Sequence, residues 1–141
     1  MKGKTLLALG LSLLFVSLFP CTANAMALNS SENYIGFTDA DYSRYTYVQS
    51  TVTYVDPSSS GVEYSVSIFG NSLVTSISGT IKVYKGTTEI YSTYVYSGKR
   101  TLFANNTIPT QGSGTYKVTF SGTVYATTGS EPLELEHTDS Y

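Results

Sequence analysis

The few side chains that could carry out chemistry stand close together in this sequence. General acid–base catalysis needs a titratable group held near its target, and the only histidine is His137, with Asp139 two residues later on the same face of an extended segment. Glu134 and Glu136 share the opposite face, and a pair of carboxylates is what glycoside hydrolysis uses. Alternating glutamates also protect an edge strand from aggregation, and the chain has no tryptophan on which a sugar could stack. We interpret these residues as parts of an edge strand and expect no catalytic residues.

Metal-binding patterns are equally sparse. Asp39 and Asp41 have the spacing that opens a calcium loop, but Ser50 stands where the bidentate glutamate would be, and the sixth position holds no glycine. There is no histidine or cysteine cluster, no phosphate-binding glycine loop and no nucleophile elbow. We therefore expect no metal site and no cofactor.

Tyrosines and one basic turn are the better candidates for a site. Tyr91, Tyr94 and Tyr96 precede Lys99 and Arg100 in a chain with 13 tyrosines. Tyrosine supplies a large, rigid and amphipathic contact area, and with Ser and Thr it is typical of protein and glycan recognition surfaces. These five residues form our predicted binding patch. The alternative is that the three tyrosines pack the protein core.

Strands must position all of these residues. The best one runs over 112–125, where Tyr116, Val118 and Phe120 alternate with polar residues, as one dry and one wet face require. Gly112 and Gly114 supply the preceding turn. Tyr116 beside that turn resembles the tyrosine of immunoglobulin-like domains that bonds back to its loop. The alternative is an ordinary core aromatic.

Further strands are predicted over 45–55, 62–68, 73–84, 89–96, 101–108 and 131–137, separated by turn residues. In the third of these we expect Leu73, Ile77 and Ile81 to face the core, with a bulge or bend at Gly79. About seven strands with turns every 8 to 12 residues predict a single antiparallel β-sandwich of immunoglobulin-like type. The fold class is thus all-β.

The sequence starts with the pattern of a signal peptide over 1–25. Lys2 and Lys4 precede an apolar stretch over 6–19, and Ala25 ends a small-x-small cleavage site; cleavage after Ala27 is the alternative. Lipid attachment at Cys21 is a further alternative, disfavoured by the preceding proline. We expect a polar, mobile leader over 26–44, the sandwich over 45–141, and secretion to the outside of the cell.

Charge limits the partners. Removing Lys2 and Lys4 leaves six basic residues (8 − 2) against ten acidic ones, a balance that argues against nucleic acid and anionic membranes. We expect a non-enzymatic module that binds a protein or glycan, or associates with the cell surface. The alternative is an antibacterial or pore-forming toxin, whose hairpins would present one apolar face to lipid; only then would a membrane be a partner. The oligomeric state is left open.

Two strand phrases carry a resemblance. Residues 78–86 read Ser-Gly-Thr-Ile-Lys-Val-Tyr-Lys-Gly, and residues 114–125 read Gly-Thr-Tyr-Lys-Val-Thr-Phe-Ser-Gly-Thr-Val-Tyr. With the signal peptide, they make residues 60–141 resemble short exported proteins of Gram-positive bacteria that carry an immunoglobulin-like domain of unknown function. The resemblance implies an exported β-sandwich and transfers no site residues.

Overall fold

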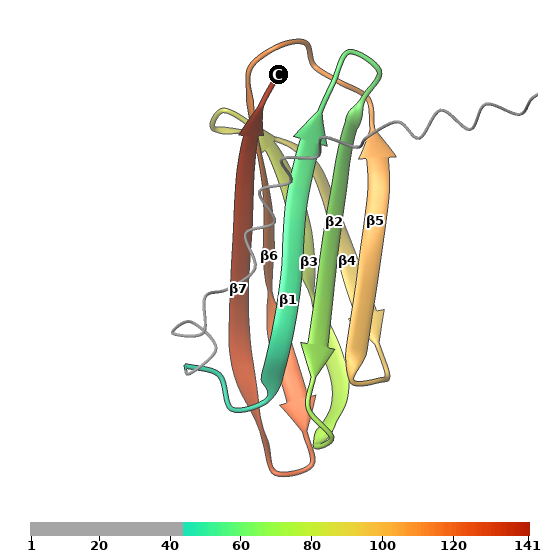
Figure 1. Cartoon of the computed structure of the whole chain (residues 1–141), viewed down its shortest axis with the longest axis vertical. Helices are drawn as coiled ribbons and strands as arrows, with labels where there is room; N and C mark the ends of the chain where they lie inside the picture. The colour runs from blue at the N-terminus through green and yellow to red at the C-terminus, as the bar shows by residue number, and fades with distance from the viewer. Residues whose placement is uncertain (1–43) are drawn as a thin grey trace, which may run out of the picture. The chain divides into compact units, whose positions relative to one another are not determined.

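A computed structural model describes residues 44–141 as two β-sheets packed face to face (Figure 1). The seven strands are β1 (Val48–Pro57), β2 (Val62–Gly70), β3 (Val74–Lys85), β4 (Thr88–Ser97), β5 (Thr101–Ile108), β6 (Thr115–Ala126) and β7 (Gly129–Ser140). The predicted signal peptide, residues 26–43 of the predicted leader, and the pair Asp39 and Asp41 lie outside the described residues.

The sheets contain three and four strands. Their orders are β1-β2-β5 and β4-β3-β6-β7, and every neighbouring pair is antiparallel. The predicted all-β architecture of two antiparallel sheets and seven strands is confirmed. At one side of the sandwich the edge strands are β1 and β7, and at the other side they are β4 and β5 (Figure 1).

The core lies between the sheets and follows the predicted alternation. In β2, for example, every second residue from Val62 is buried while the residues between them are only half-buried or exposed. Burial of one such side chain stabilises the fold by about 1.5–3 kcal/mol. The largest fully buried residues are Val55, Val62, Val66, Ile68, Ile77, Ile81, Val83, Tyr116, Val118, Phe120, Val124 and Leu133.

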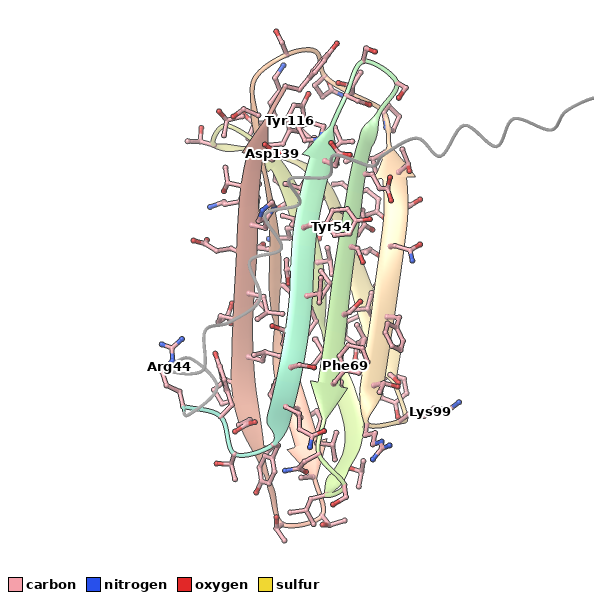
Figure 2. The ribbon with its side chains drawn as sticks, in the orientation of Figure 1. Arg44, Tyr54, Phe69, Lys99, Tyr116 and Asp139 are labelled. Atoms are coloured by element: carbon pink, nitrogen blue, oxygen red, sulfur yellow. The ribbon has the colours of Figure 1, made fainter. Side chains whose placement is uncertain are left out.

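Tyr116 bonds back to the turn that precedes its strand, which favours the first of the two alternatives considered for it. Its hydroxyl donates to the carbonyl of Gly112 at 2.5 Å and accepts from the backbone N–H of Gln111 at 3.0 Å. Gly112 has φ of 85°, a value that glycine adopts without steric cost. The side chain of Tyr116 (Figure 2) is fully buried, so these bonds satisfy a hydroxyl that no bulk water reaches.

The prediction for Leu73 was wrong. Leu73 is 41% exposed, and its neighbour Val74 is buried instead. The register of β3 against β6 shifts between Val74 and Ser76, so Thr75 is an additional residue on β3. One extra residue reverses the side-chain alternation on that part of the strand.

Gly79 does not mark a bulge, because the pairing of β3 runs unbroken through it. It stands directly opposite Gly122 of β6, in the same sheet. The ring of Phe120 covers both glycines: a Cβ added to either would lie 2.5–2.6 Å from its Cζ atom. The repeated Ser-Gly-Thr phrase therefore places two glycines side by side under one buried aromatic ring.

The β1 and β7 edges are joined by side-chain hydrogen bonds. The carboxylate of Glu131 accepts from the three consecutive backbone N–H groups from Thr46 to Val48, at 2.7, 2.8 and 3.1 Å. The backbone N–H of Val55 donates to Nδ1 of His137 at 3.1 Å. Strand β1 begins at Val48, later than the predicted residue 45, since the preceding N–H groups bind Glu131.

Candidate binding surface

The predicted tyrosine-rich strand is β4, an edge strand with no fully buried residue. Tyr94 and Tyr96 point away from the core and are 67% and 65% exposed. The side chains that alternate with them along the strand, Thr93 and Val95, face the other way and are only partly exposed. The alternative that all three tyrosines pack the core is therefore excluded for Tyr94 and Tyr96.

Tyr91 lies on the inner face, apart from the other two tyrosines. Its ring centroid is 5.7 Å from that of Tyr64, which stands opposite Asn106 of β5, and the two tyrosine hydroxyls influence each other's pKa. Burial, and then the bond to Tyr91, raise the pKa of Tyr64 well above its ordinary value of 10.0. The bond from Tyr64 lowers the pKa of Tyr91, because a donated hydrogen bond stabilises the phenolate.

Hydroxyl side chains surround Tyr94 and Tyr96 on the outer face of the four-stranded sheet. Successive residues across a sheet are close enough for a ligand to contact several at once. On β3, Thr80 pairs directly with Tyr94 and Ser78 with Tyr96. Ser121 and Thr123 lie one strand further across the sheet, on β6. This face thus has two aromatic rings at its edge and hydroxyl groups next to them.

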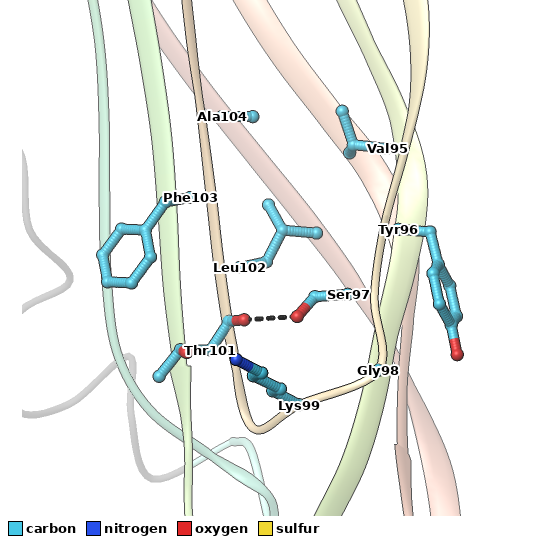
Figure 3. A pocket seen from close by; sticks show the side chains of 9 residues that line it. All are labelled: Val95, Tyr96, Ser97, Gly98, Lys99, Thr101, Leu102, Phe103 and Ala104. Atoms are coloured by element: carbon cyan, nitrogen blue, oxygen red, sulfur yellow. Dashed lines mark hydrogen bonds between the residues drawn. The ribbon is translucent and has the colours of Figure 1, made fainter.

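Lys99 and Arg100 lie in the exposed turn between β4 and β5. The hydroxyl of Ser97 donates to the carbonyl of Thr101 at 2.6 Å, which joins the two sides of the turn (Figure 3). Lys99 and Arg100 follow Tyr96 by three and four residues, at the end of the strand on which Tyr94 and Tyr96 share the outer face. Tyr91 lies on the inner face, apart from these four residues.

A cleft of about 730 Å³ opens between the β4 and β5 edges above this turn. Val95, Leu102 and Ala104 line its inner part, while Tyr96 and Phe103 project on opposite sides (Figure 3). Phe103 is 62% exposed.

Sequence reasoning missed Phe103 as a surface residue. Its exposure could have been predicted from the alternation along the strand, because Phe103 and its neighbour Leu102 must point to opposite faces. Its ring packs edge to face against Phe69 of β2, with centroids 5.1 Å apart (Phe69 is labelled in Figure 2).

The residues considered for catalysis are separated. His137 is buried and accepts the Val55 bond, whereas Asp139 is exposed on the outside. Glu134 accepts a hydrogen bond from the Ser121 hydroxyl at 2.6 Å, and Glu136 lies 4.0 Å from Lys117. These contacts are those of an edge strand joined to its neighbours.

Among residues 44–141 no group of three histidine, cysteine or acidic side chains is placed to hold a metal ion. The part of the chain that the structure describes has no helix long and apolar enough to cross a membrane. Comparison with known proteins found no match to this chain among protein-family models, curated proteins or solved structures.

Proposed function

We propose that this chain is an exported, non-enzymatic binding module that holds a protein or glycan ligand against Tyr94, Tyr96 and the Lys99-Arg100 turn. The observation that carries the proposal is the exposure of two large aromatic side chains, 67% and 65%, in a row of otherwise small hydroxyl residues. Side chains this exposed add little to the core, so contact with another molecule is the role their chemistry supports.

We also propose that the domain is of immunoglobulin-like type, and the order of the strands supports this. When the strands are lettered A to G along the chain, the sheets read A-B-E and D-C-F-G. The constant-type immunoglobulin domain has A-B-E-D and C-F-G, so only the fourth strand changes sheet. The bonds from Tyr116 to the preceding turn, at the entry to strand F, add to this support.

The ligand that fits the surface has both an apolar face and acidic groups. The rings of Tyr94 and Tyr96 can stack on a sugar or on an aromatic side chain, and the neighbouring hydroxyls can donate or accept hydrogen bonds. Lys99 and Arg100 favour a carboxylate or sulfate at the end of the tyrosine row. An acidic glycan or an acidic peptide meets these requirements.

A double variant tests the proposal. Tyr94→Ala with Tyr96→Ala should abolish retention on an array of acidic glycans, on immobilised acidic peptides and on whole cells, with a loss of affinity of about 30-fold or more. Its melting temperature should stay within a few degrees of the parent. Tyr141→Ala is the matched control, because Tyr141 is 47% exposed at the opposite end of the sandwich.

Three results would contradict the proposal. If the parent protein binds none of the arrays or cells, the exposed tyrosines have another role. If it releases dye from liposomes, the toxin alternative is favoured and the membrane becomes its partner. A collapse of the melting temperature in the double variant would show that the two tyrosines stabilise the fold.

A further inference from the structure

The outer edge of β4 is open to strand pairing. Among the described residues β4 pairs only with β3, so one row of its backbone N–H and C=O groups faces outward. Residues 90–98 contain no charge and no proline, the features that usually prevent edges from pairing. By contrast, β7 carries Pro132 and alternating glutamates, and its edge is joined to β1 through Glu131 and His137.

The two ends of β4 carry opposite charges. Glu89 is near the start of the strand, and Lys99 and Arg100 follow its end. Glu89 holds Lys82 at 2.9 Å and is still 42% exposed, so a second cation can reach it. β5, the other strand at this side, has no charged residue and therefore nothing that would fix the direction of a partner strand.

We propose that β4 pairs antiparallel with β4 of a second copy of this chain, around a two-fold axis at Tyr94. Glu89 stands five residues before Tyr94, and Lys99 stands five after it in the turn that follows β4, so this axis brings Glu89 of each copy to the end of the other copy's β4, where Lys99 and Arg100 lie. A two-fold contact must be self-complementary, and this distribution of charge meets that condition. The inference goes beyond the binding function proposed above and does not depend on it.

The pairing accounts for the exposed side chains of β4 in a different way from a ligand. Tyr94 of one copy would lie beside Tyr94 of the other, and Tyr96 beside Ser92, as directly opposed residues on one face. The two four-stranded sheets would become one sheet of eight. The contact is small, so it should be a weak association that depends on protein concentration.

Sedimentation equilibrium on charge variants tests the pairing. The parent should dimerise, and Glu89→Lys alone, or Lys99→Glu with Arg100→Glu, should raise the dissociation constant about tenfold or more by placing like charges together. The triple variant that combines these changes restores the opposite charges and should recover most of the affinity. A monomeric parent at millimolar concentration, or a dimer insensitive to both reversals, would overturn the proposal.

Disulfide trapping gives a second, independent readout of the register. In an antiparallel pair the Cα atoms of opposed residues are about 4.5–5.5 Å apart, within the range that a disulfide spans. Tyr94→Cys in a Cys21→Ser background should therefore form a covalent dimer on mild oxidation. Tyr125→Cys, an exposed position on β6, is the matched control and should stay monomeric; equal cross-linking of both would refute the axis at Tyr94.

Both experiments measure self-association in the absence of a ligand. A parent protein that binds the ligand but stays monomeric would contradict only the β4 pairing. A retained dimer that binds no array would contradict only the proposed function.

Discussion

Gly122→Ala tests why two glycines face each other under Phe120. The added Cβ would lie 2.5 Å from Cζ and 2.8 Å from Cε1 of the Phe120 ring, where ordinary contact needs 3.4–4 Å. It would also press on the backbone carbonyl of Ser78, which cannot rotate away as a side chain can. The ring or the strand must move by about 1 Å to admit one methyl group.

The cost follows from where the ring lies. Phe120 is fully buried between the sheets, so its displacement compresses the core. Overpacking of this kind costs about 1–3 kcal/mol, and the contact with the Ser78 backbone places Gly122→Ala near the upper end, at about 2–3 kcal/mol. For a domain of about 100 residues this lowers the melting temperature by about 10–20 °C.

Urea unfolding of a double-mutant cycle measures the effect. Gly122→Ala should cost at least about 1 kcal/mol less in a Phe120→Leu background, because the smaller side chain leaves space for the methyl group. Gly98→Ala is the control, since its nearest neighbour is the mobile end of Tyr96, 3.3 Å away, and should change stability by less than about 0.5 kcal/mol. Equal losses in both backgrounds would refute the role assigned to Phe120.

Three further outcomes are expected. Tyr116→Phe should lower the free energy of unfolding by about 2 kcal/mol, because it removes the hydroxyl that bonds to Thr110, Gln111 and Gly112. The exposed Tyr125→Phe should cost almost nothing, and equal losses would contradict this. Because burial raises the pKa of Tyr64, this tyrosine ionises just above pH 10 only in the unfolded chain. The free energy of unfolding should therefore fall by up to about 1.4 kcal/mol for each pH unit above 10. Urea titrations at pH 9 and 11 should show a smaller fall for Tyr64→Phe than for the parent. Glu131→Ala should destabilise the protein by about 2–3 kcal/mol, since three N–H groups lose a charged acceptor. Amide hydrogen exchange should become faster at residues 46–48, and unchanged exchange there would show that the carboxylate is dispensable.

Local pattern was enough to predict most of the strands. The alternation of apolar and polar residues predicted that Val62, Val66 and Phe120 lie in the core. This was possible because every second side chain of a strand points to the same face, whatever its neighbours are. The turn before Tyr116 and its hydrogen bond were also predictable, since donor and acceptor lie within five residues.

Features that depend on a neighbouring strand could not be predicted in this way. The extra residue Thr75 exchanges Leu73 and Val74 between surface and core, and it is defined only by the register with β6. The pairing of Gly79 with Gly122 joins residues 43 positions apart (122 − 79). Glu131 showed only as one of several acidic residues, because its three partners are 83–85 residues away.

For the same reason, only part of the candidate site could be predicted. The alternation along β4 separates Tyr91 from Tyr94 and Tyr96, but which side faces the core depends on the sheet to which β4 belongs. Phe103 lines the cleft beside the turn only because β5 returns next to β4 in the other sheet.

The bonds between β1 and β7 also bear on when the protein can fold. The backbone N–H of Val55 binds His137, and those of residues 46–48 bind Glu131, more than 80 residues later in the chain. A growing chain therefore cannot close the sandwich until almost all of it has been synthesised, and contacts of such long sequence separation form slowly.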